Sequence, residues 1–133
     1  MPAKETIQAY YDAFNRQDMA AFFDLLHEDV IHDINQGGRQ VGKDAFRDFM
    51  AHMNRCYRET LTDMVIMSSE DGSRGAAEFV VNGQYLATDE GLPEANGQTY
   101  VLPAGAFFEI RDGKVARITN TYNLNDWIAQ VGA

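Results

Sequence analysis

The sequence has little cysteine, little proline and few cationic side chains. Its 133 residues include one cysteine (Cys56), three prolines, and 11 Lys or Arg against 20 Asp or Glu, for a net charge of −9. A single cysteine excludes a disulfide within the chain and favours a reducing compartment. The shortage of Lys and Arg argues against binding to nucleic acid or to an anionic membrane surface.

Long hydrophobic runs are also missing. No apolar stretch approaches the length that spans a membrane, and residues 1–10 lack the charged-then-apolar pattern of a leader. We therefore expect a cytoplasmic protein with no membrane partner. The sequence also has no repeats and no linker, so residues 1–133 are expected to form a single domain with a real core.

The first half of the chain carries apolar residues at helical spacing. The first stripe, at i, i+3, i+4 and i+7, consists of Ile7, Tyr10, Tyr11 and Phe14. Asp18 is placed to cap a second helix over residues 19–26, and a third helix is expected over residues 42–54. Between them, β-branched residues predict a short strand over 30–34.

The second half alternates apolar and polar residues and predicts a meander of extended strands. These strands are expected over residues 60–68, 75–85, 99–110 and 114–122. Asn82-Gly83 indicates a bulge or bend within its strand, residues 87–98 a polar excursion at the edge of the sheet, and Trp127 a short final helix.

Helices followed by an antiparallel meander are typical of an α+β domain. We expect the N-terminal helices to pack on one face of a strongly curved antiparallel sheet, as a cone-shaped α+β barrel. A cone that contains a few polar groups is suited to a small hydrophobic molecule.

Four segments support a resemblance to a known family. They are YYDAFNRQD at residues 10–18, LLHEDV at 25–30, GKDAF at 42–46 and FFEIRDGKV at 107–115. Together they resemble the nuclear transport factor 2-like superfamily, and within it the ketosteroid-isomerase and SnoaL-like polyketide-cyclase branch. The resemblance implies the cone fold, a homodimer, and either an isomerase, cyclase or dehydratase or a plain binding module, so the fold alone does not give the function.

The resemblance also suggests roles for individual positions. Ketosteroid isomerases use a carboxylate base with a tyrosine and a protonated aspartic acid as donors. The tyrosine matches Tyr10, the base falls on Asp33 or Ile34, and the second acid falls on Gly105, which has no side chain to donate. In the cyclase branch an acid–base residue lies on the last strand, where this chain has Asn120, which cannot titrate.

Two neighbouring residues compete for the role of proton-transfer group. His32 lies between Val30 and Ile34 on one face of its strand, so it points to an apolar interior; it is either a general acid–base or a buried histidine bonded to the backbone. Asp33 is on the other face and is either a catalytic base or a strand-end residue that accepts backbone amides.

Other residues are expected to bind the substrate. Tyr10 is either a hydroxyl donor or an ordinary core tyrosine, and Asn120 on the last strand either orients a ligand or ties the structure together. The remaining residues expected to line the pocket are Phe14, Met53, Phe79, Phe107 and Tyr122.

Metal and cofactor motifs are not evident. The three histidines form no HExxH, Cys56 has no CxxC partner, and the glycines form no phosphate loop. We therefore expect a cofactor-independent enzyme that transfers a proton on a small apolar carbonyl compound. The alternatives are a binding module that sequesters a hydrophobic molecule, and an interaction protein that recruits another chain through its sheet.

Overall fold

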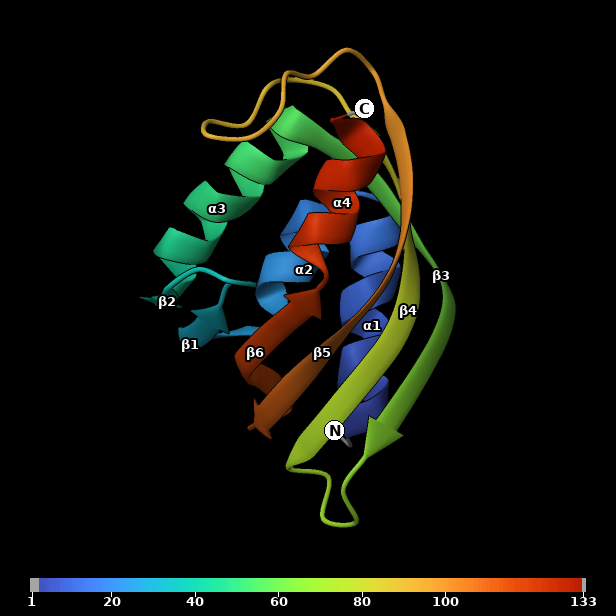
Figure 1. Ribbon diagram of the computed structural model, residues 1–133. Coiled ribbons are helices and arrows are strands. Elements are labelled where there is room, and N and C mark those ends of the chain that lie inside the picture. Colours follow the sequence, from blue (N-terminus) through green and yellow to red (C-terminus); the bar gives the residue numbers. More distant parts are fainter. Residues whose placement is uncertain (1–2, 133) are drawn as a thin grey trace.

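The computed structural model describes residues 3–132, which form four helices and one six-stranded sheet (Figure 1). In chain order the elements are α1 (Ala3–Asn15), α2 (Met19–Asp24), β1 (Leu26–Asp33), β2 (Arg39–Val41), α3 (Lys43–Cys56), β3 (Tyr57–Ser68), β4 (Arg74–Tyr85), β5 (Thr99–Arg111), β6 (Lys114–Tyr122) and α4 (Leu124–Val131). The α+β prediction is confirmed.

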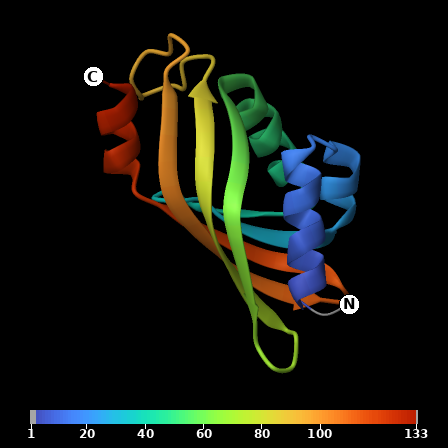
Figure 2. The ribbon, with the colours of Figure 1, turned by 90° about the vertical axis from the view of Figure 1, so that its right-hand side faces the viewer.

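The sheet has the strand order β2-β1-β6-β5-β4-β3 and does not close into a barrel. Neighbouring strands are antiparallel except β1 and β6, which run parallel, so the sheet is mixed rather than purely antiparallel. The long strands β3, β4 and β5 curve, and α1, α2 and α3 lie to the same side of them (Figure 2). We call the face toward these helices the inner face.

Aromatic side chains fill the space between the helices and the inner face. The ring of Tyr10 lies 4.5 Å from that of Phe22 and 5.7 Å from that of Phe108, measured between centroids. The predicted cap is present, since the carboxylate of Asp18 accepts a hydrogen bond from the amide of Ala21 at 3.1 Å. At the other end of the sheet, the Trp127 ring of α4 lies 5.0 Å from the ring of Tyr85.

Two predictions near the N-terminus are corrected. The second helix ends at Asp24 rather than at residue 26, and β1 starts at Leu26, well before the expected strand at 30–34. The reason is long-range pairing: Leu26 aligns with Val115 of β6, which local sequence cannot reveal. The same effect produces β2, an edge strand that pairs with β1 and was not predicted.

The bulge expected at Asn82-Gly83 is also absent. Through these two residues β4 keeps an unbroken register with both of its neighbours. The irregularity lies instead in the β3–β4 pair between Thr62 and Val65, where Asp63 adopts a positive φ of 55°. None of the helices within residues 3–132 is long and apolar enough to cross a membrane.

Candidate functional site

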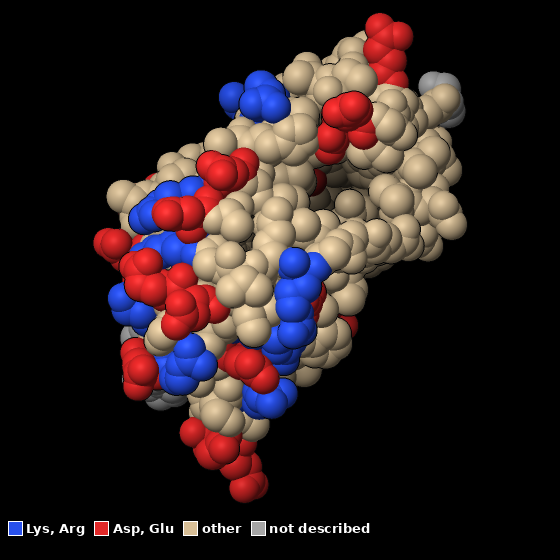
Figure 3. Space-filling view, turned by 90° about the vertical axis from the view of Figure 1, so that its left-hand side faces the viewer, with Lys and Arg blue, Asp and Glu red and all other residues tan. Residues whose placement is uncertain are grey.

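The inner face and the helices enclose a cavity of about 360 Å³. Its walls are mostly apolar and include Phe14, Phe46, Phe49, Met53, Leu61 and Phe79. Figure 3 views the molecule from the left-hand side of Figure 1 and shows a hollow there. The hollow is bordered mainly by uncharged residues, with acidic side chains beside it. The volume lies at the lower end of the range for ligand pockets, so the cavity suits a small molecule.

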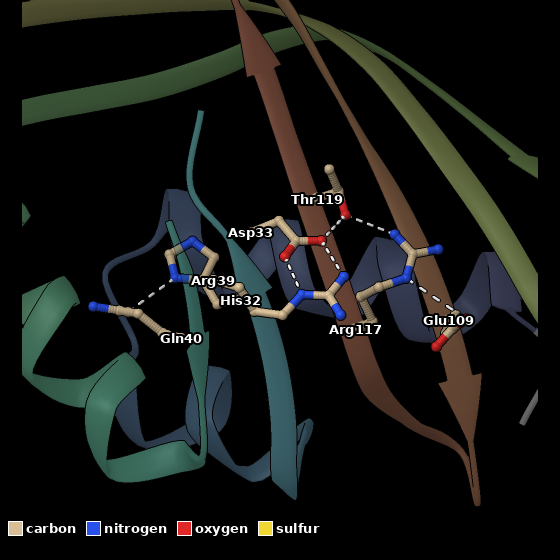
Figure 4. A network of polar contacts seen from close by, with 7 residues as sticks. All are labelled: His32, Asp33, Arg39, Gln40, Glu109, Arg117 and Thr119. Atoms are coloured by element: carbon tan, nitrogen blue, oxygen red, sulfur yellow. Dashed lines mark hydrogen bonds and ion pairs between the residues drawn. The ribbon is translucent and has the colours of Figure 1, made fainter. Parts of the chain in front are cut away.

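His32 lies at the wall of this cavity and is only 2% exposed. Its ring stacks on that of Phe46 with the centroids 4.3 Å apart. The amide of Asn120 donates to Nε2 at 3.3 Å, so the ring proton sits on Nδ1, which donates to Oε1 of Gln40 at 3.4 Å (Figure 4 shows the contact with Gln40). Burial lowers the pKa of His32, so the imidazole is neutral at physiological pH.

Two tyrosines from α1 reach the same cavity. Tyr10 is 4% exposed, and burial raises the pKa of its hydroxyl, which therefore stays protonated and can donate. Its hydroxyl makes no hydrogen bond to any of residues 3–132. The hydroxyl of Tyr11 is buried and likewise lacks a partner within that range. Both hydroxyls are thus left for a ligand or for water.

Most of the other predicted pocket residues also line the cavity. Asn120 and Tyr122 reach it from β6, where alternation puts them on one face. Phe14, Met53 and Phe79 reach it from α1, α3 and β4. Whether these side chains bind a substrate stays a prediction.

Asp33 does not line the cavity, and the expectation that it might act as a base there is corrected. Its carboxylate accepts hydrogen bonds from Arg39 Nε at 2.6 Å and from the Thr119 hydroxyl at 2.6 Å (Figure 4). Arg117, two residues earlier on β6, in turn donates to the Thr119 hydroxyl, which extends the network along that strand. The hydrogen bond from Arg39 lowers the pKa of Asp33 to about 2, so this carboxylate is a poor base that ties β1 to β2 and β6.

Phe107 is the second predicted pocket residue that lies elsewhere. It is 54% exposed on the outer face of β5, whereas its neighbours Ala106 and Phe108 are buried on the inner face. The alternation of the strand therefore turns Phe108 into the core and keeps Phe107 away from the cavity.

Sequence reasoning missed two carboxylates that line the cavity, Glu59 and Asp89. Glu59 accepts a hydrogen bond from the Tyr100 hydroxyl at 2.5 Å, and burial raises the pKa of the Glu59 carboxyl. It was missed because the strand was expected to start at residue 60. The alternation of Tyr57, Glu59 and Leu61, which all line the cavity, was the signal that could have revealed it.

Asp89 belongs to the segment 87–98, which was expected to be a polar excursion at the sheet edge. This segment is tied to the end of α3, since the amides of Leu86 and Ala87 both donate to the carbonyl of Cys56. Asp89 accepts hydrogen bonds from His52 Nε2 at 2.8 Å and from the Tyr57 hydroxyl at 2.7 Å. The segment thus brings a carboxylate to the cavity wall.

His52, Cys56 and Asp89 are the residues of this region that could hold a metal, with one ligand atom each within 4.8 Å of the others. The contact between His52 Nε2 and Asp89 Oδ1, at 2.8 Å, is a hydrogen bond. Two nitrogen or oxygen ligands of a tetrahedral zinc ion lie about 3.3 Å apart, so these atoms would have to separate. The arrangement fits a hydrogen-bonded cluster better than a preformed metal site.

Comparison with known proteins agrees with this architecture. A family model described as a SnoaL-like domain matches residues 7–118. A candidate polyketide cyclase from Pseudomonas putida is 69% identical, with 98% of each chain covered and a TM-score of 0.97. A candidate polyketide cyclase from Xanthomonas campestris is 57% identical, with 96% of this chain and 95% of the other covered and a TM-score of 0.93. One from a Silicibacter species is 55% identical, with 99% of this chain and 96% of the other covered and a TM-score of 0.97. No curated protein matches the chain.

Proposed function

The chain belongs to the SnoaL-like family, and from this premise we propose that it is a cofactor-independent isomerase, cyclase or dehydratase that transfers a proton on a small apolar carbonyl compound. The observation that carries the proposal is a neutral histidine, His32, held by two side-chain amides in the wall of an apolar cavity. An imidazole that is neutral at the working pH can accept a proton as a general base and return it as a general acid.

His32 Nε2 is the atom that takes the proton. Its present donor, the Asn120 amide, lies at a long 3.3 Å, so a substrate can displace this contact at little cost. When a C–H bond next to the carbonyl breaks, its proton passes to Nε2, and its electron pair moves toward the carbonyl oxygen. The proton is then returned to another atom of the substrate, so the histidine is regenerated.

Tyr10 is the proposed donor to the oxygen on which negative charge develops. Its hydroxyl is protonated, buried and unpaired within residues 3–132, so it can donate without first breaking a bond to the protein. The Asn120 amide, released from Nε2, orients the substrate. A positioned acid–base group typically contributes ~10²–10⁴-fold in rate.

A non-catalytic binding module is the second candidate. In the resting structure the lone pair of His32 Nε2 already accepts a hydrogen bond from Asn120, as expected for a histidine that only completes a polar tie. Such a protein would hold a hydrophobic molecule in the same cavity without any titrating group at the ligand.

The test begins with native mass spectrometry of freshly purified protein, followed by denaturation to identify any small molecule that is released. Turnover of carbonyl compounds of that class is then measured against pH for wild type, His32→Gln and Asn120→Ala. Because burial lowers the pKa of His32, kcat/KM should rise with pH to a plateau, with the midpoint of the rise below the ordinary value of 6.5.

We expect His32→Gln to lose at least ~10²-fold in kcat/KM while binding of the same compound survives. Asn120→Ala should mainly raise KM. An unchanged rate in His32→Gln would overturn the proposed role of His32. Binding without turnover of any compound in wild type would leave the binding module as the function.

A further inference from the structure

Three residues from three different strands form one row across the inner face. Glu59 of β3 is directly opposite Gly83 of β4, and Gly83 is directly opposite Tyr100 of β5. Two strand spacings, about 10 Å, therefore separate the backbones of Glu59 and Tyr100. The Tyr100 side chain crosses β4 to reach Glu59, and its hydroxyl donates to Oε2 at 2.5 Å.

Gly83 is what lets the two side chains meet. A Cβ at this position would lie 2.2 Å from Cζ and 2.3 Å from Cε2 of Tyr100, closer than real Cβ contacts come. Gly83 has no positive φ, so the backbone does not require glycine here. The absence of a side chain is needed only for the ring of Tyr100 to lie over the strand.

Glu59 is partly buried, and its carboxylate has few partners in the protein. No Lys, Arg or His among residues 3–132 forms an ion pair with it, and Tyr100 is its one hydrogen-bond donor within that range. Oε1 has no donor from the described chain. Asp89, the other carboxylate of the cavity, differs in that each of its oxygens is already occupied, by His52 and by Tyr57.

A partly buried carboxylate with one donor from the protein takes its remaining hydrogen bonds from water or from a ligand. Glu59 lines the cavity, so its free oxygen is accessible to whatever fills that space. Glu59 also borders a smaller polar hollow that includes Asn15 and Arg58, but the main cavity is mostly aromatic and aliphatic, so a ligand there that donates to Glu59 is a mostly apolar molecule. A hydroxyl needs one acceptor, whereas an ammonium group needs up to three, which favours a hydroxyl.

We propose that Glu59 is the acceptor of a binding subsite for a hydroxyl group of the ligand (alcohol, enol or phenol), and that Tyr100 is its positioning residue. The inference rests on the proposed function, because both place the ligand in the same cavity. It adds that the molecule carries a hydroxyl as well as the carbonyl group proposed to lie near His32.

Two aromatic probes of similar shape test the subsite. The phenol 2-naphthol can donate a hydrogen bond, and 2-methoxynaphthalene cannot. Their dissociation constants are measured by equilibrium dialysis at pH 7 for wild type, Glu59→Gln and Glu78→Gln. Glu78 lies exposed on β4, so its variant removes the same charge away from the cavity. A naphthylmethylammonium salt is the third probe and tests for a cation site.

We expect wild type to bind 2-naphthol about 10-fold or more tightly than its methyl ether, since a hydrogen bond to a charged group contributes ~10–100-fold in affinity. The preference should fall to about twofold or less in Glu59→Gln, because a neutral amide is a weaker acceptor. Glu78→Gln should keep the wild-type preference.

Several results would overturn the subsite: no preference in wild type, a preference that survives in Glu59→Gln, tighter binding of the ammonium probe, or no binding of either neutral probe. Tyr100→Phe tests positioning separately. Donation from Tyr100 lowers the pKa of Glu59, so the variant should raise that pKa in carbon-13 NMR titration. An unmoved pKa would overturn the role of Tyr100.

The two proposals can fail independently. If the naphthol preference depends on Glu59 while His32→Gln leaves turnover unchanged, the subsite stands and the proposed chemistry fails. If turnover depends on His32 while the probes are not distinguished, the chemistry stands and the subsite fails.

Discussion

Replacing Gly83 with alanine should destabilise the protein through a single contact. The new Cβ would lie 2.2 Å from Cζ of Tyr100, whose ring is 2% exposed and therefore cannot swing into solvent. Overpacking of this kind typically costs about 1–3 kcal/mol. Alanine in a strand interior otherwise gains roughly 0.5–1 kcal/mol over glycine, so the expected net loss is about 1–2 kcal/mol.

The effect of Gly83→Ala on the free energy of unfolding should change sign when the Tyr100 ring is removed. Tyr100→Leu lacks the Cζ, Cε2 and Oη atoms that the new Cβ would meet. In that background Gly83→Ala should be neutral or stabilising by up to about 1 kcal/mol. The four proteins of this double-mutant cycle are compared by urea unfolding, and the predicted coupling is about 2 kcal/mol.

An equal cost of Gly83→Ala in both backgrounds would refute the reasoning, since it would mean that backbone geometry, not the ring, requires the glycine. The cycle also bears on the subsite. Displacing the ring removes the Tyr100 donor from Glu59, so Gly83→Ala should weaken the naphthol preference even though residue 83 does not line the cavity.

Two further predictions concern the outer face. Asp33→Asn should lose about 1 kcal/mol of stability at pH 7, a figure reduced for solvent screening of the exposed Arg39 partner. The carboxylate contributes fully above its unfolded pKa of 3.8 and loses its effect as the pH falls through its folded pKa of about 2. The thermal unfolding of variant and wild type should therefore converge below pH 2, and a gap that persists there would contradict the ion-pair explanation. We also propose that the chain forms a homodimer through exposed apolar residues of β5, Val101 and Phe107. Native mass spectrometry should then give a dimer for wild type and more monomer for Phe107→Ser, and a wild-type monomer would refute it.

The fold could be predicted well because its signals are local. Helical spacing and the alternation of strands revealed most elements, and alternation alone put His32 on the inner face, where it is 2% exposed. Alternation also explains the error at Phe107. Adjacent residues of a strand point to opposite faces, so Phe107 and the buried Phe108 cannot both face inward.

The rest of the site depends on register between distant strands. Nothing near Glu59 in the sequence shows that Tyr100 will donate to it, since the two residues are 41 positions apart and meet only across Gly83. Asp89 was hidden for a similar reason, because its contact with His52 exists only once segment 87–98 is tied to the end of α3. Which distant segments pair with each other cannot be determined from a single sequence.

The parallel pairing of β1 with β6 has a consequence for the order in which the protein matures. His32 and Asn120 are 88 positions apart, and β1 reaches the main sheet only through β6. On the ribosome, the helices and the β3–β4–β5 meander can assemble while β1 can pair only with the short edge strand β2 and has no link to the main sheet. The histidine is therefore fixed in the cavity wall at the last step, after a long loop has closed. A nascent chain stalled before residue 114 should contain the hairpin of β3 and β4 but leave β1 open to proteases.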